Sequence, residues 1–134
     1  MIVLDEQLLG RGIDVEIGKW YKGPVQFIND LRPGTVIKDE AITSILRSVD
    51  RPTFVTINDK DFWRKRPLDP GVCMVCFALS DSRAGEIPQL LRRLLRHPQL
   101  RSKAGRMGTM LRVADAGTTF YTVRDATIQK LGDE

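Results

Sequence analysis

Residues 53–61 read TFVTINDKD, and this stretch contributes more than any other to the predicted fold. Residues 53–57 are β-branched or aromatic throughout, which is typical of a strand buried on both faces. The chain then turns polar at Asn58 and brings in two carboxylates, Asp59 and Asp61. Buried strands of this kind belong mainly to parallel sheets, whose carboxyl ends share one edge. The stretch therefore predicts acidic side chains at the edge of a parallel sheet.

The same order of features, an apolar strand and then acids, opens the chain. Residues 1–4 predict a short buried strand, and Asp5 and Glu6 follow it directly. Asp39 and Glu40 form a third acidic pair, in the first turn of a predicted helix. Carboxylates gathered in one crevice repel each other and favour a hard divalent cation, Mg²⁺ or Mn²⁺. Each acid taken alone has an ordinary alternative role as a turn residue or a helix cap.

The rest of the chain predicts strands separated by helices. An apolar stripe predicts a helix over 39–49, and leucines on one face predict another from Ile87 to a stop at His97-Pro98. Residues 7–23 carry four glycines and predict only a short turn of helix followed by an irregular or short strand segment. Further strands are predicted over 25–31, 72–79, 109–113 and 118–123, the last two as a hairpin. This order predicts an α/β fold with a mainly parallel sheet and an antiparallel extension.

Length and composition place the chain among ordinary globular proteins. Its 134 residues and 15.2 kDa predict one domain over 1–134. No apolar run approaches the roughly 20 residues of a membrane-spanning helix, so we expect no membrane association. The start, MIVLDEQLLG, lacks the basic region of a signal peptide and predicts a cytoplasmic protein.

The two cysteines, Cys73 and Cys76, lie in the apolar segment CMVCF. Residues three apart on a strand point to opposite faces of its sheet, and a redox pair normally begins a helix instead. One histidine and no second cysteine pair leave too few ligands for a structural zinc site. We therefore expect two buried, inert thiols.

Positive charge is concentrated in one part of the sequence. Residues 83–112 carry eight basic residues and one acidic residue, whereas residues 1–82 carry 11 basic and 12 acidic residues. Such a segment is either a solvated helix face or a surface that binds phosphates. We expect Arg92, Arg93 and Arg96 to face solvent or a partner.

A second basic stretch directly follows the acids of the buried strand. Trp63, Arg64, Lys65 and Arg66 could hold an RNA backbone and stack a base. The alternative is that Trp63 packs in the core or an interface and that the cations are solvated. Phe62 is predicted to lie in the core.

Three motifs, VLDEQL (3–8), KDEAITSIL (38–46) and FVTINDKDFWR (54–64), resemble those of the PIN-like domains. This nuclease superfamily includes the VapC toxins and small bacterial PIN-like proteins. The segments PGVCMVCFAL (70–79), the arginine-rich leucine helix and GTMLRVADAGTTFYTVR (108–124) follow in the family's order. The resemblance implies a three-layer α/β/α fold, clustered acids that bind Mg²⁺ or Mn²⁺, and cleavage of RNA. It also implies an antitoxin protein as partner.

The same resemblance implies roles for individual residues. Asp5 corresponds to the metal ligand that follows the first strand, and Asp39 to the acid that opens the middle helix, with Glu40 as its substitute. The acids after the buried strand correspond to Asp59 and Asp61. Around these ligands, Thr56 and Asn58 would orient the carboxylates. Glu6 would stand beside them, either pointing away from the crevice or serving as a further ligand.

Two functions from different classes remain open at this stage. The first is a metal-dependent endoribonuclease, a toxin-like component of a toxin–antitoxin pair. The second is a PIN-like module that binds nucleic acid or protein without cleaving, because residues 7–18 are short and broken by glycines where the family has a clear amphipathic helix. In either case the resemblance and the apolar terminal strands predict a homodimer.

Overall fold

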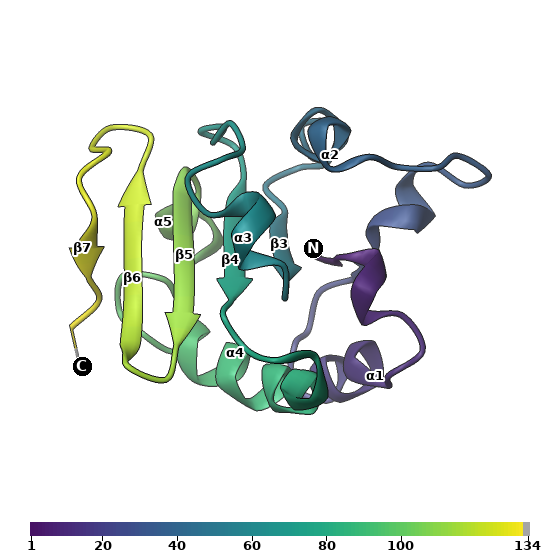
Figure 1. Cartoon of the computed structure of the whole chain (residues 1–134), viewed down its shortest axis with the longest axis horizontal. Helices are drawn as coiled ribbons and strands as arrows, with labels where there is room; N and C mark the ends of the chain where they lie inside the picture. Colours follow the sequence, from purple (N-terminus) through teal and green to yellow (C-terminus); the bar gives the residue numbers. More distant parts are fainter. Residues whose placement is uncertain (133–134) are drawn as a thin grey trace.

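The computed structural model, which describes residues 1–132, has a mixed α/β fold built on a seven-stranded sheet (Figure 1). The strands lie in the order β2-β1-β3-β4-β5-β6-β7. The first five strands in this order pair in parallel, and β6 and β7 are added antiparallel. The strands are β1 (Ile2–Leu4), β2 (Val25–Phe27), β3 (Thr53–Thr56), β4 (Cys73–Phe77), β5 (Thr109–Ala114), β6 (Gly117–Thr122) and β7 (Gln129–Lys130).

Five α-helices and three short 3₁₀ helices connect the described strands. The longest is α4, where Pro88 stands at the start, a position at which its missing N–H has no helical partner. The α-helices are α1 (Ile13–Gly18), α2 (Asp39–Leu46), α3 (Asp59–Phe62), α4 (Ile87–Leu95) and α5 (Lys103–Arg106). The 3₁₀ helices are η1 (Glu6–Leu8), η2 (Ile28–Leu31) and η3 (Asp81–Glu86).

Successive residues of the central strands contribute to two different hydrophobic clusters, because side chains alternate between the faces of a sheet. Val55 and Val75 pack with the apolar residues of α1 and α4. Phe54 and Met74 pack with those of α2 and with Phe62 of α3. Phe62 is fully buried, with its ring 5.5 Å from that of Phe54, so its predicted place in the core is confirmed.

The cysteines of β4 follow the same alternation. Cys73 belongs to one cluster and Cys76 to the other, and both thiols are free and fully buried. Burial raises the pKa of Cys73 to about 12 and raises that of Cys76 further. The expectation of buried thiols on opposite faces is confirmed.

The parallel core of the sheet was predicted well, and its margins less well. The predicted strand over 25–31 is wrong beyond Phe27, because the N–H of Phe27 donates to the Asp30 carboxylate at 3.0 Å and the chain turns into η2. The helix predicted over 39–49 ends at Leu46, and β7 was not predicted. Residues 133–134 of the predicted domain lie outside the described residues.

The parallel pairing brings the ends of β1 and β3 together. Leu4 lies opposite Val55, and the N–H of Asp5 donates to the carbonyl of Val55 at 2.9 Å. The residues that follow these two strands therefore share one edge of the sheet. Within residues 1–132, no helix has the length and apolar character needed to cross a membrane.

Candidate functional site

Asp5 is the most deeply buried acid of the candidate site. It follows β1, and only 3% of its surface is exposed. The Thr56 hydroxyl at the end of β3 donates to Asp5 Oδ2 at 2.6 Å. Burial raises the pKa of Asp5, and the hydrogen bond from Thr56 opposes that rise. The fold thus holds a carboxylate where its charge is poorly solvated and has no cationic partner within ion-pair distance among residues 1–132.

Asp39 places a second carboxylate close to the first. It begins α2 and is partly buried. Loss of hydration raises the pKa of Asp39, and the negative charge of Asp61 adds to the effect. The charge of Asp39 in turn raises the pKa of Asp5. Asp39 therefore interacts electrostatically with Asp5 and with Asp61, because such interactions are strong only over short distances.

Asn58 and Thr56 organise the turn that carries Asp61. The backbone N–H of Asn58 donates to Thr56 Oγ1 at 3.0 Å, and its side-chain amide donates to Asp61 Oδ2 at 2.5 Å. Thr56 therefore accepts one hydrogen bond and donates another to Asp5. The two residues predicted to orient the acids do contact acids in this way.

Glu6 lies at the margin of the acidic region. Its exposed side chain accepts a hydrogen bond from Asn29 Nδ2 at 3.2 Å. The side-chain oxygen of the same residue, Asn29 Oδ1, is buried and has no hydrogen-bond partner among the described residues. Asn29 follows β2, so a third parallel strand also sends a polar side chain to this edge.

Two arginines neutralise part of the acidic set. Arg112 Nε in β5 donates to Asp59 Oδ2 at 3.1 Å, so Asp59 is directed toward β5. Arg66 pairs with two acids of α2: its Nη2 lies 3.9 Å from Asp39 Oδ2, and its Nη1 lies 3.9 Å from Glu40 Oε1. Among residues 1–132, no three Asp, Glu, His or Cys side chains are arranged as a group that could hold a metal ion.

The donor chemistry of this edge nevertheless suits a hard cation. All of the candidate ligands offer oxygen, which Mg²⁺ and Mn²⁺ prefer. The unpaired Asn29 Oδ1 is a further oxygen of that kind. The residues that offer such oxygens at this edge are Asp5, Asp39 and Asp61, with Glu40, Glu6 and Asn29 at the margin. Asp59 would join them only after release from Arg112.

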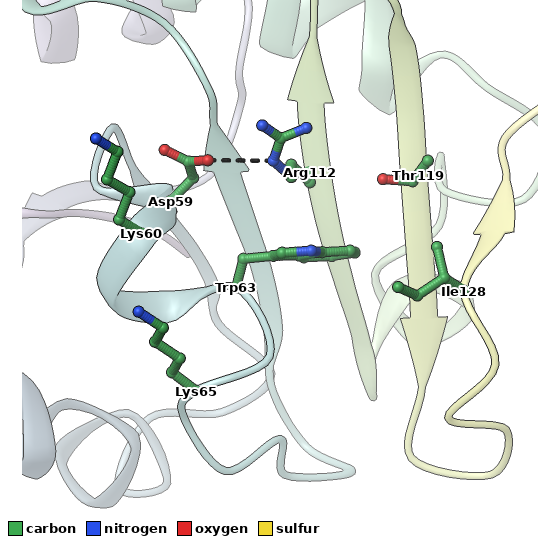
Figure 2. A pocket seen from close by; sticks show the side chains of 7 residues that line it. All are labelled: Asp59, Lys60, Trp63, Lys65, Arg112, Thr119 and Ile128. Carbon is green, nitrogen blue, oxygen red and sulfur yellow. Dashed lines mark hydrogen bonds and ion pairs between the residues drawn. The ribbon is translucent and has the colours of Figure 1, made fainter.

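A basic and aromatic hollow lies beside the acidic edge. It has a volume of about 480 Å³ and combines one acidic and three cationic side chains with an aromatic, a hydroxyl and an aliphatic one: Asp59, Lys60, Trp63, Lys65, Arg112, Thr119 and Ile128. Figure 2 shows the indole of Trp63 reaching from the end of α3 toward β5, with Thr119 and Ile128 beyond it. The Trp63 ring also packs against Tyr121, with centroids 5.1 Å apart.

The four residues of the predicted basic stretch separate in the structure. Trp63 is partly buried and Lys65 is exposed, and both line the hollow. Arg64 is exposed in a left-handed turn with φ of 62°, outside the lining. Arg66 turns back to Asp39 and Glu40, where its Nε is buried without a hydrogen-bond partner among the described residues.

Two residues of the site were not predicted from the sequence. Arg112 stands in an apolar strand opposite Cys76, and a lone charge in such a strand was a usable signal. Asn29 was hidden inside a predicted strand that in fact ends at Phe27. Comparison with known proteins found no matching family model, curated protein or solved structure.

Proposed function

We propose that this chain is a metal-dependent endoribonuclease of the PIN type, with the acidic edge as its active site. The burial of Asp5 beside the charge of Asp39, on which the charge of Asp61 acts in turn, carries the proposal. A buried carboxylate among like charges is costly unless a cation compensates it. Sites that hold such groups are often functional, because stability alone would select a neutral residue.

In this proposal Asp5, Asp39 and Asp61 hold Mg²⁺ or Mn²⁺, and Thr56 and Asn58 keep two of those carboxylates in place. The bound ion supplies Lewis-acid stabilisation of the charge that develops on a phosphodiester. Arg112 Nε donates to Asp59 Oδ2 at 3.1 Å, and Arg112 exchanges this carboxylate for a phosphate when RNA binds. Arg66 pairs with Glu40 in the same way, with its Nη1 3.9 Å from Glu40 Oε1.

The hollow next to the acids would bind the RNA strand. Lys60, Lys65 and Arg112 offer cations for phosphates, and Trp63 offers a ring for a base. A strand bound in this way would cross the carboxyl edge of the sheet, where open parallel sheets bind ligands.

The wider assignment follows the resemblance of the motifs to PIN-like domains. It consists of a three-layer α/β/α domain with a C-terminal hairpin, a toxin-like role in the cytoplasm, and an antitoxin as partner. The two hydrophobic clusters on opposite faces of the sheet support the layered fold. Exposed Val123 and Ile128, near the antiparallel end of the sheet, support a homodimer through that end.

A calorimetric titration of Mn²⁺ tests the proposal before any RNA substrate is chosen. We expect saturable binding by the wild type and its loss in Asp5→Asn, because Asp5 is the central ligand. Asp14→Asn is the matched control, since Asp14 lies on α1 and makes no ion pair among residues 1–132. Absence of Mn²⁺ binding by folded wild-type protein would contradict the catalytic proposal.

The alternative is a PIN-like module that binds nucleic acid or protein without cleaving. The ion pairs of Asp59 with Arg112 and of Asp39 with Arg66 favour it, because internal cations then replace the metal. This module would bind single-stranded RNA with a salt-dependent affinity that EDTA leaves unchanged. The nuclease would lose RNA cleavage in EDTA.

A further inference from the structure

A second basic hollow lies at the opposite edge of the sheet from the acids. Its volume is about 280 Å³, and it is lined by arginine, aromatic and aliphatic side chains: Trp20, Tyr21, Arg92, Leu95, Arg96, Arg101 and Arg106. Arg106 contacts Thr53, the first residue of β3, whereas the acidic edge begins where β3 ends. The two sites are therefore separated by the length of the parallel strands.

Arg106 is the unusual member of this hollow because it is a buried cation. Only 3% of its surface is exposed. Its Nε donates to Thr53 Oγ1 at 2.7 Å and its Nη1 to the carbonyl of Leu100 at 3.1 Å. Both partners are neutral, and no carboxylate among residues 1–132 pairs with it. A buried guanidinium without a counter-charge favours an anion that enters from solvent.

Three further arginines surround the opening. Arg92 and Arg96 are four residues apart at the end of α4, so they project from the same side of that helix. Arg101 completes the set from the following loop. All three are exposed, and none forms an ion pair among the described residues. Positive charge is therefore concentrated around this opening, and no acidic side chain among the described residues forms an ion pair with it.

The other wall of the hollow is aromatic. Trp20 and Tyr21 follow α1, with ring centroids 6.1 Å apart and planes at 82°. This edge-to-face contact orients the two partly buried rings, which both line the hollow. A flat ring beside a group of arginines matches a ligand that has both a planar base and a phosphate.

We propose that this hollow binds a nucleotide, with its phosphate on the arginines and its base against Trp20. Phosphate suits the site because guanidinium groups bind it through paired, charge-assisted hydrogen bonds. The volume of about 280 Å³ lies just below the range of small-molecule sites, about 300–1,000 Å³, and so suits one compact unit rather than a length of peptide. The site does not depend on the proposed nuclease function, because it shares no residue with the acidic edge.

Fluorescence of Trp20 offers a direct test. The chain has two tryptophans, so Trp63→Phe leaves Trp20 as the only one and replaces the indole of the other hollow by a phenyl ring, which does not contribute to tryptophan emission. In this background we expect adenosine 5′-monophosphate to quench the emission saturably. Replacing Arg92 and Arg96 together by glutamine should weaken binding by about tenfold or more, because each arginine–phosphate contact is charge-assisted.

Arg93→Gln is the matched control, since Arg93 is exposed on α4 and lines a different hollow. It should change the affinity by less than about twofold. Arg101→Gln provides an independent variant on a separate segment, and circular dichroism verifies the fold of each. A ten-residue oligouridine distinguishes a free nucleotide from one within RNA, and saturable quenching by either probe supports the site.

Three results would overturn the proposal. One is the absence of saturable quenching with both probes. Another is equal weakening by Arg93→Gln and by the double variant, which would mean nonspecific attraction to a basic surface. The third is equally tight binding of inorganic phosphate or a hexaglutamate peptide, which would remove any role for the base.

Discussion

At the scale of single residues, Asp5 shows most clearly a conflict between burial and charge. The Thr56 hydroxyl supplies one hydrogen bond to its carboxylate, while burial and the charges of Asp39 and Glu6 act against ionisation. The net effect is that the pKa of Asp5 in the folded chain lies above its ordinary value. Folding therefore favours the protonated carboxyl, and the stability of the fold depends on pH through this group.

The pH dependence has a definite sign. Between the ordinary pKa of the unfolded chain, 3.8, and the raised pKa of the folded state, the folded chain binds more protons than the unfolded chain. The contribution of Asp5 to the free energy of unfolding is thus fully present below pH 3.8 and is lost as the pH rises through the folded pKa. Asp39 contributes in the same direction.

We therefore expect Asp5→Asn to raise the free energy of unfolding at pH 7. The asparagine keeps an oxygen that can accept the Thr56 hydrogen bond, and it carries no charge to bury. Urea denaturation of both proteins between pH 4 and pH 8 measures the difference, which should shrink toward pH 4. A variant less stable than the wild type at pH 7 would mean that the carboxylate is favourably paired.

At the scale of elements, two glycines mark where the chain tolerates a side chain and where it does not. Gly108 precedes β5 with φ of +74°, and a Cβ there would lie 3.0 Å from Val123 Cγ2 and 3.6 Å from the Pro70 backbone. Gly18 ends α1, and an added Cβ would meet nothing within 4 Å. The same substitution should therefore have opposite effects at the two positions.

Gly108→Ala should lower the free energy of unfolding by about 1–3 kcal/mol, because the left-handed conformation and the close contact both disfavour a Cβ. Gly18→Ala should raise it by about 0.5–1 kcal/mol, because alanine loses less entropy than glycine in a helix. Thermal denaturation of the two variants beside the wild type measures both. Destabilisation by Gly18→Ala as large as that by Gly108→Ala would contradict this account.

At the scale of the whole molecule, β4 lies in the centre of the sheet and both of its thiols are covered. β3 and β5 flank it, and hydrophobic clusters cover Cys73 on one face and Cys76 on the other. A reagent can reach these sulfur atoms only when the clusters open. Their reactivity therefore reports the stability of the complete fold rather than that of one loop.

We expect both thiols to react with Ellman's reagent about a thousandfold or more slowly in the native chain than in guanidinium chloride. A free energy of opening of about 5 kcal/mol or more produces that factor. The raised pKa values slow the reaction further, because the thiolate is the nucleophile. Fast labelling of either cysteine under native conditions would show that β4 opens locally.

Much of the architecture could be predicted because it depends on local patterns. Burial is indicated locally by the β-branched and aromatic residues of β3 and by the leucine face of α4. Acids placed directly after β1 and β3 also had to share an edge once the strands were parallel. The contact of Thr56, at the end of β3, with Asp5, directly after β1, follows from that topology.

Side-chain pairing across long separations depended on the tertiary structure. Arg112 is 53 positions from Asp59, and their contact arises only because β5 lies beside β4 in the assembled sheet. In the same way, Arg106 meets Thr53 and leaves four arginines around one hollow. Local sequence sets which segments are strands and helices, because hydrophobic periodicity and turn chemistry act between near neighbours. Which charge meets which partner is decided by packing, because Coulomb attraction and burial depend on distances that exist only in the folded chain.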